Sequence, residues 1–475
     1  MVPSFLFFLA VFLIIGVSSY FYSLHTRHDY YLASQTMPPW LVGLSAVATN
    51  NSGYMFIGII GFTYTSGLSS IWLMIGWITG DFLASLFVHP RLREATSQCD
   101  ETSYAGVISH WGGTRFKVLQ RLAAVVSIIF LLAYSSAQMV AGGKALQVLF
   151  GWPGWGGAVL VAMIVLAYCL AGGIRASIWT DAAQSFVMII AMGLLLVAGI
   201  MSFGGIGQVL NEMNRIEGYL NWFPRDSIIP GTMGMALFVT GWMFAGVSVI
   251  GQPHIMVRFM TLKDPGKMLN ARIWYYSWYI LFYSMTCGVG LLSRVYLGDT
   301  WDFDAELALP TMAVQLLSPP LVGLILAGMF AATMSTADSL VLSCSASLTH
   351  DLIPHRIEKN WILKLATTIM TVLALIWALV NSQSVFSLVI MAWSALASAF
   401  APILLVLAWG GRLTQPVAIT MMSAGIMTVF LWRLADLHVF IYEGMPGILV
   451  GLLVYFVFNT SVESSKEIRL ESADS

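Results

Sequence analysis

The chain has 475 residues, of which 58% are hydrophobic and 9% are charged, and its formal net charge is −1. A typical soluble domain carries about 25% charged residues, so this composition excludes a water-soluble protein and indicates one embedded in a lipid bilayer. The near-neutral charge provides no basic surface, and nucleic acid is not expected as a partner.

Thirteen apolar stretches are long enough for membrane helices, which need about 20 mostly apolar residues each. We therefore predict an all-α polytopic membrane protein. The thirteen spans lie near residues 4–23, 39–65, 69–89, 119–148, 154–174, 177–203, 231–256, 268–297, 318–350, 360–381, 384–409, 415–434 and 438–458. The first span has no basic leader and no small-residue cleavage site, so we expect a retained helix rather than a signal peptide.

Lysine and arginine set the expected orientation, because cytoplasmic loops of membrane proteins are rich in these residues. With the N-terminus outside, all but five of the 22 lysines and arginines fall on the cytoplasmic side. Arg258 is one of those expected on the cytoplasmic side. The five on the outer side are Lys144, Arg215, Arg225, Arg294 and Arg433. We expect a protein of the plasma (inner) membrane with its N-terminus outside and its C-terminus in the cytoplasm.

Polar and flexible residues interrupt the second span, in SAVATNNSGYMFIG (45–58). Residues 49–52 are consecutive polar residues, and Gly53 follows them; asparagine, serine and glycine are poor helix formers. In transporters, solutes and ions bind where helices break near the middle of the membrane. Glycine is common in membrane helices, but a run such as TNNSG favours a functional break.

The seventh span is interrupted in GWMFAGVSVIGQPH (241–254), where Pro253 cannot continue the helical hydrogen bonding. The two interruptions lie five spans apart, so equivalent helices would run in opposite directions, as in an inverted five-helix repeat. The predicted parts are a leading helix and loop (1–38), a first repeat (39–203), an extracellular loop (204–230), a second repeat (231–409), and two trailing helices with a short tail (410–475).

The ninth span contains the polar stretch AATMSTADS (331–339). Ala332, Ser335 and Thr336 share one helical face, where two hydroxyls and a carbonyl offer about half of a sodium shell. Carbonyls released near Ala48 and Asn51 can supply the rest. The alternative is that the hydroxyls bond to the preceding turn or join two helices.

Four segments resemble the sodium/solute symporter family, most closely its sodium/proline symporters. AATMSTADSLVLSCSASLTHDL (331–352) is similar to the family's eighth core helix, and GQPHIMVRFM (251–260) to the stretch after the sixth. LSAVATNNSGY (44–54) and AGGIRASIWTDAAQ (171–184) are similar to the first and fifth. The resemblance runs from about residue 10 to 458.

The resemblance implies a LeuT-like fold of two inverted five-helix repeats, with one leading and two trailing helices. It also implies that Na+ binds between the first and eighth core helices. Carried over residue by residue, the ligands are the carbonyls of Ala48, Asn51 and Ala332 and the hydroxyls of Ser335 and Thr336.

Three carboxylates inside predicted spans need weighing, because ionisable groups in the membrane usually mark function. Asp181 matches an aspartate that some relatives use at a second ion site or an inner gate; the alternative is a structural pair. Asp338 lies about 200° around the helix from Thr336, so we expect it to pair, to cap, or to line the cytoplasmic exit. Asp81 receives no role beyond a buried pair.

The solute pocket is expected between the broken helices and their neighbours. Its predicted residues are Asn50, Ser52, Gly53, Tyr54, Trp77, Tyr134, Gln138, Phe244, Ser248 and Val249. The proline-type pattern has an aspartate in place of Asn50 and aromatic residues in place of Ala245 and Val249. These departures leave a small amino acid or another small organic solute as the broader expectation.

The expected function is secondary active transport, in which Na+ moving inward drives the uptake of a small solute by alternating access. Proton coupling through Asp81 or Asp181 is the alternative within transport. A membrane enzyme is not expected, because no HExxH, GxSxG or suitably flanked intramembrane aspartate pair occurs. A sensor is not expected either, because the tail is too short for a signalling domain.

Overall fold

The computed structural model describes residues 1–99, 101–224, 229–298, 303–353, 357, 359–380 and 384–471, and only the backbone of 148, 149 and 459–471. Residues 225–228 of the predicted outer loop, Arg225 among them, lie outside the described residues. So do the last four residues of the predicted tail.

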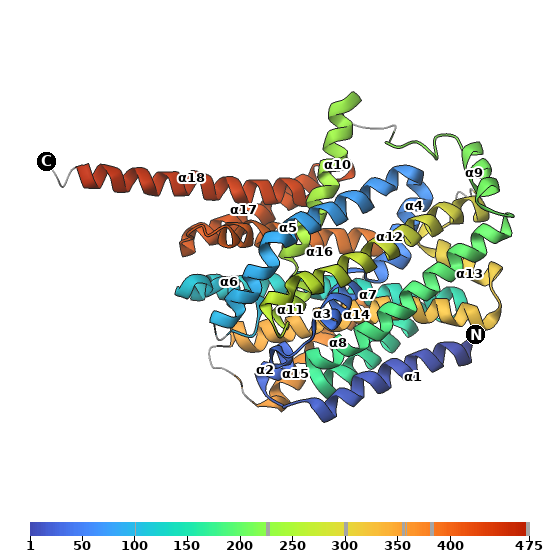
Figure 1. Cartoon of the computed structure of the whole chain (residues 1–475), viewed down its shortest axis with the longest axis horizontal. Coiled ribbons are helices and arrows are strands. Elements are labelled where there is room, and N and C mark those ends of the chain that lie inside the picture. The colour runs from blue at the N-terminus through green and yellow to red at the C-terminus, as the bar shows by residue number, and fades with distance from the viewer. Residues whose placement is uncertain are drawn as a thin grey trace.

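The regular structure in the described residues is helical, with a single bridge between Met37 and Leu262 (Figure 1). The α-helices are α1 (Val2–Ser18), α2 (Arg27–Leu32), α3 (Pro39–Asn50), α4 (Ile60–Ser66), α5 (Ile71–Gln98), α6 (Tyr104–Ser109), α7 (Lys117–Phe150), α8 (Gly154–Ser202), α9 (Ile206–Arg215), α10 (Gly231–Val247), α11 (Pro253–Met260), α12 (Met268–Leu297), α13 (Ala308–Leu316), α14 (Pro319–Ala346), α15 (Asn360–Val380), α16 (Val385–Ala408), α17 (Gln415–Leu434) and α18 (Gly444–Glu471).

Shorter helical turns connect or extend these helices. They are η1 (Ser19–Tyr22), η2 (Ala33–Gln35), η3 (Met55–Ile59), η4 (Gly67–Ser70), η5 (Trp111–Gly113), η6 (Ser248–Gly251), η7 (Pro265–Lys267), η8 (Ala305–Leu307), η9 (Ser347–Leu352) and η10 (Leu437–Val439). Of these, η3 and η9 are π-helical and the others are 3₁₀-helical.

Ten helical stretches among the described residues are long and apolar enough to cross a membrane. The two longest, Met55–Gln98 and Gly154–Ser202, have 44 and 49 residues. Each contains a glycine with positive φ, Gly67 and Gly173 respectively, at which the chain bends. The all-helical membrane architecture is confirmed, whereas the count of thirteen spans stays a prediction.

Both predicted interruptions are confirmed. The first broken helix ends α3 at Asn50, and Asn51 leaves the helical region with φ −90° and ψ 73° before the chain winds again into η3 and α4. The second passes from α10 through η6 to Gln252, which is extended with φ −99° and ψ 102°, and then into α11. Pro253 begins α11, where its missing N–H removes no helical bond.

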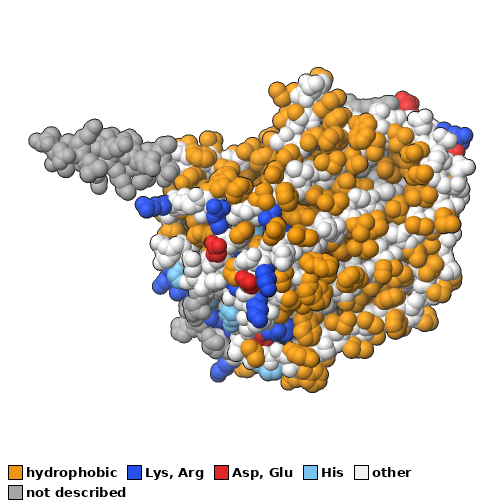
Figure 2. All heavy atoms as spheres, in the orientation of Figure 1, with side chains coloured by type: hydrophobic (Ala, Val, Ile, Leu, Met, Phe, Trp, Pro, Cys, Tyr) orange, Lys and Arg blue, Asp and Glu red, His pale blue; other side chains and the backbone are white. Residues whose placement is uncertain are grey.

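The exterior suits a lipid bilayer. Hydrophobic side chains cover most of the visible face, whereas lysine and arginine gather at the left-hand end, where α2, α6 and α11 lie (Figure 2). α1 begins at the right-hand end, and α18 ends beyond the left-hand end (Figure 1). Large apolar side chains such as Ile14 and Met201 are exposed, as expected of helices that face lipid.

The centre of the molecule is built around α14, which packs against α8, α7, α1 and α3. Every residue from Ile325 to Leu342 is buried. The hydroxyls and the carboxylate of the AATMSTADS stretch are therefore enclosed by protein and must find partners on neighbouring helices.

The bend in α8 is held by α2. Gly173 has φ +57°, and a Cβ added there would lie 2.4 Å from the carbonyl oxygen of Tyr30, so only glycine fits. Arg175, two residues on, pairs with buried Asp29 at 2.5 Å. Burial raises the pKa of the Asp29 carboxyl, but Arg175 and the Leu24 N–H outweigh this effect and lower the pKa below its ordinary value.

Candidate functional site

The first broken helix meets α14 through a cluster of oxygen atoms. The Ser335 hydroxyl lies 3.1 Å from the carbonyl oxygens of both Ala48 and Ala332. The Thr336 hydroxyl lies 2.9 Å from the carbonyl oxygen of Thr49. All five residues are buried. The structure therefore brings together the two distant stretches from which the sequence predicted an ion site.

The break itself releases these carbonyls. In an unbroken helix the N–H groups of Ser52 and Gly53 would bond to the carbonyls of Ala48 and Thr49. Here the Gly53 N–H donates instead to the Gln138 side chain at 2.9 Å. A carbonyl that has lost its helical partner is available to a hydroxyl or to a cation.

The donor set fits a monovalent hard cation. It consists of neutral carbonyl and hydroxyl oxygens, which Na+ prefers and from which it can also leave. In the structure the two hydroxyls donate to the carbonyls, and around a cation all of these oxygens would turn lone pairs toward it. The described contacts do not include the Asn51 carbonyl, so its role as a ligand stays a prediction, and the Thr49 carbonyl is an oxygen that the sequence did not single out.

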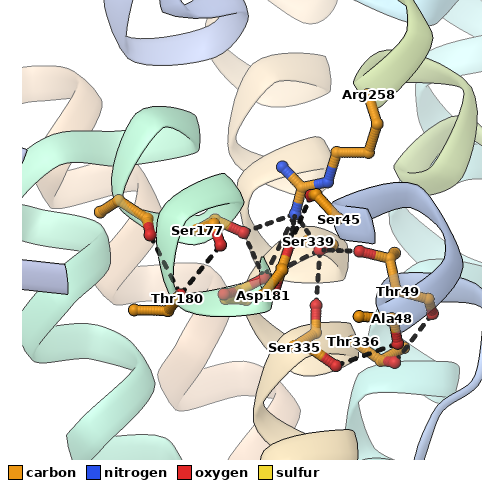
Figure 3. A network of polar contacts seen from close by, with 12 residues as sticks. Ser45, Ala48, Thr49, Ser177, Thr180, Asp181, Arg258, Ser335, Thr336 and Ser339 are labelled. Carbon is orange, nitrogen blue, oxygen red and sulfur yellow. Dashed lines mark hydrogen bonds and ion pairs between the residues drawn. The ribbon is translucent and has the colours of Figure 1, made fainter. Parts of the chain in front are cut away.

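A network of charged groups adjoins this oxygen cluster (Figure 3). The Ser45 hydroxyl donates to Asp181 at 2.6 Å, and the Arg258 guanidinium lies 3.4 Å from the same carboxylate oxygen. The same guanidinium nitrogen lies 3.4 Å from Asp338, which also accepts from Ser177 at 2.7 Å. Arg258 therefore bridges a carboxylate on α8 and another on α14.

Ser339 joins the charged network to the oxygen cluster. Its hydroxyl donates to the Ser335 carbonyl at 2.7 Å, lies 3.2 Å from the Thr49 hydroxyl, and accepts from Arg258. Figure 3 shows Arg258 reaching down from α11 to these side chains on α8, α14 and α3. A change at the carboxylates can therefore reach the predicted ion ligands through one residue.

Arg258 lies in a packed helix and not in an exposed loop. Its side chain is fully buried, because α11 continues to Met260, beyond the predicted end of the seventh span at residue 256. The side of the membrane on which it lies stays a prediction. A buried arginine needs carboxylates near it, and the two aspartates fulfil that need. The expectation that Asp338 pairs is confirmed.

Several predicted solute residues gather around the first break. The Tyr134 hydroxyl donates to Ser52 at 3.2 Å. Tyr54 lies against Trp77 and Phe386, with ring centroids 6.1 and 5.4 Å away. The Tyr54 hydroxyl, the Trp77 N–H and the amide nitrogen of Gln138 are buried without a hydrogen bond among the described residues. Unpartnered polar atoms in an aromatic cluster are typical of a solute site.

The predicted solute residues at the second break have fewer contacts with the cluster around Tyr54. Ser248 bonds to the Tyr442 hydroxyl at 2.9 Å, and buried Val249 accepts from the N–H of Gln252. No ring contact or side-chain hydrogen bond among the described residues links Phe244 to the cluster around Tyr54, so its role stays a prediction.

Some residues of this region were missed by the sequence reasoning. Trp393 is fully buried, donates to the Ala245 carbonyl at 3.2 Å and lies 5.2 Å from the Trp77 ring. Tyr442 comes from the connection between the trailing helices, to which no site was assigned. Tyr275 accepts from Asn50 and donates to Asp81. The aromatic run 274–283 was the one signal for Tyr275 in the sequence.

Curated relatives cover nearly the whole chain. The model of the sodium:solute symporter family matches residues 30–425. The high-affinity proline transporter PutP of Bacillus subtilis is 29% identical, over 90% of this chain and 92% of its own length. A sodium/proline symporter of Staphylococcus aureus is 31% identical, over 94% of this chain and 90% of its own length.

Solved structures share the fold. A Na+-coupled sialic acid symporter superposes with a TM-score of 0.80 at 19% identity, over 95% of both chains. Mhp1, a nucleobase-cation-symport-1 family transporter, superposes with a TM-score of 0.60 at 14% identity, over 92% of this chain and 95% of its own. These similarities place the helical architecture among LeuT-like transporters.

Proposed function

The chain belongs to the sodium:solute symporter family, and from this premise we propose that it couples the inward movement of Na+ to the uptake of a small organic solute by alternating access. Proline or another small amino acid is the proposed solute. The family and its curated members are transporters, so the chain is not an enzyme.

One observation carries the sodium proposal. The Ser335 hydroxyl lies 3.1 Å from the Ala48 carbonyl, although the two residues are 287 positions apart in the chain. Na+ bound by Ala48, Asn51, Ala332, Ser335 and Thr336 would tie the first broken helix to α14 and favour the conformation that binds solute. Each charge that crosses contributes about 2.3 kcal/mol per 100 mV of membrane potential.

The charged network is proposed as an inner gate. Asp181 and Asp338 already share the guanidinium of Arg258. A second metal cation bound by these two carboxylates would therefore have to displace the arginine side chain. The contact joins α11, which continues the second broken helix, to α8 and α14. Alternating access in this fold moves one group of helices against another, and a contact between them can close one side.

The solute proposal rests on the relatives and on the pocket residues. Relatives at 29–31% identity are named as proline transporters. Asn50, Ala245 and Val249 depart from the proline-type pattern, so a related small amino acid is equally compatible with this pocket. The membrane orientation, with the N-terminus outside, and the division into two inverted repeats at 39–203 and 231–409 belong to the same proposal.

An uptake screen tests this function. Cells that express the chain are given radiolabelled amino acids with either sodium or choline in the medium, and cells without it are the control. We expect saturable uptake of proline or another small amino acid in sodium alone. Uptake that follows external pH and ignores sodium would contradict the proposal and favour proton coupling through Asp81 or Asp181.

A further inference from the structure

A buried carboxylate is connected to the first break by two hydrogen bonds. The amide nitrogen of Asn50 donates to the Tyr275 hydroxyl at 2.6 Å, and this hydroxyl donates to Asp81 at 2.8 Å. The three residues come from α3, α12 and α5, and Asp81 is fully buried. We propose that Asp81, acting through Tyr275, orients the Asn50 amide and thereby selects solutes whose nitrogen carries at least one N–H.

The order of donors and acceptors follows from the two hydrogen bonds. A tyrosine hydroxyl has a single hydrogen to donate. Tyr275 gives this hydrogen to Asp81 and offers its oxygen to the amide nitrogen of Asn50. The NH2 group of Asn50 is consequently the part of the amide that faces Tyr275.

The other end of the amide is left for the solute. The amide nitrogen of Asn50 donates to Tyr275, and Tyr279 also lies close to this side chain. The carbonyl oxygen of Asn50 is the acceptor that remains, and no hydrogen bond to it is found among the described residues. Asn50 keeps 7% of its surface accessible and is the last residue of α3. The C-terminal end of a helix carries partial negative charge, which favours a cationic group at the same place.

The chemistry selects a class of solute. An acceptor oxygen beside a helix C-terminus binds an ammonium or imino N–H, and it gains nothing from a fully methylated nitrogen. Amino and imino acids therefore fit this position, and betaines do not. The inference rests on the proposed function, because it assigns Asn50 to the solute site and makes Asp81 and Tyr275 positioning residues that do not touch the solute.

The test compares proline with proline betaine, its N,N-dimethylated form, as competitors of sodium-dependent uptake of radiolabelled proline. In the unchanged protein we expect proline to compete at least about tenfold better, the factor that one charge-assisted hydrogen bond provides. In Asp81→Asn and in Tyr275→Phe the amide can turn, so the preference should shrink severalfold. The half-saturation concentration for proline should rise while the maximal rate is kept.

Tyr283→Phe is the matched control. Tyr283 lies two turns further along the same face of α12, and its hydroxyl has no hydrogen bond among the described residues, so its removal should leave the preference unchanged. If Tyr275→Phe does not reach the membrane, Asp81→Asn carries the test, with surface amounts measured for each variant.

The outcomes separate the two proposals. If no amino acid is taken up in sodium, the proposed function fails. If another amino acid is taken up in place of proline, the same comparison is made with that amino acid and its fully N-methylated form. The inference fails if the unchanged protein prefers the N-methylated solute, or if Asp81→Asn and Tyr275→Phe both keep the full preference.

Discussion

Gly53, at the first break, is enclosed by α7 and α14. Gly53 gives its N–H to Gln138, and a Cβ added to it would lie 2.5 Å from Thr333 and 3.0 Å from the Gln138 side-chain oxygen. The sequence identified Gly53 as part of a flexible run. It could not show that the glycine also permits close contact with α14, because its neighbours come from distant positions in the chain.

Gly53→Ala tests this contact. The added methyl should push the break away from Thr333 and weaken solute uptake at least about tenfold, since overpacking a closed site costs about 1–3 kcal/mol. Uptake and surface amount are measured together. Gly207→Ala is the control, because no atom lies within 4 Å of its Cβ position and alanine is favoured in the helix α9. Equal uptake by both variants would contradict the constraint at Gly53.

At the scale of helices, local breakers were predictable and tertiary partners were not. The run TNNSG and Pro253 identified both interruptions, because backbone preferences act locally. The predicted span ended at residue 256, whereas α11 continues to Met260 and has Arg258 in its last turn. In the sequence, a charged residue at the end of a span looks like a loop residue, because its buried partners are not visible there. Asp181 and Asp338 stand 77 and 80 positions from Arg258, beyond the reach of any periodicity.

Arg258→Met tests the gate at this scale. Without the guanidinium, two buried carboxylates lose their shared counter-charge, and the contact of α11 with α8 and α14 should loosen. Ser343 is half-buried and lines a cavity of about 20 Å³ together with Arg258. We expect a cysteine introduced by Ser343→Cys to react faster with a thiol reagent from the cytoplasmic side, and uptake to fall.

Arg258→Lys serves as the comparison for this variant. Lysine keeps the charge but not the planar fork, so we expect an intermediate reaction rate. A rate for Arg258→Met equal to that of the parent would rule out a gating role for this contact. A loss of uptake without a change in that rate would instead favour direct binding of a cation by the two aspartates.

At the scale of the whole molecule, composition was enough to predict a membrane protein, whereas the LeuT-like fold could be predicted only from the family resemblance. Few charges and many apolar stretches predict a membrane protein by themselves. The arrangement of two repeats depends on how helices meet, which hydropathy does not encode. The orientation rests on the distribution of lysine and arginine, which crowd at one end of the visible face (Figure 2), and it stays a prediction.

Cysteine labelling tests the orientation. The four native cysteines are buried and should not interfere. Arg215 on α9 and Lys267 in η7 are exposed and belong to predicted opposite sides. With a membrane-impermeant maleimide on intact cells, Arg215→Cys should be labelled at once and Lys267→Cys only after permeabilisation. The reverse pattern would invert the proposed topology.

The central claim is that oxygens of the first broken helix and of α14 hold Na+, and equilibrium binding of radioactive sodium to the purified protein tests it most directly. We expect saturable binding that weakens at least about tenfold in Ser335→Ala with Thr336→Ala, because two ligands are removed. The control is the double variant Ser136→Ala with Thr286→Ala, which also replaces one serine and one threonine by alanine. Because the described hydrogen bonds of these two hydroxyls stay within their own helices, this variant should bind sodium like the unchanged protein. Unaltered sodium affinity in the Ser335 and Thr336 double variant would contradict the account.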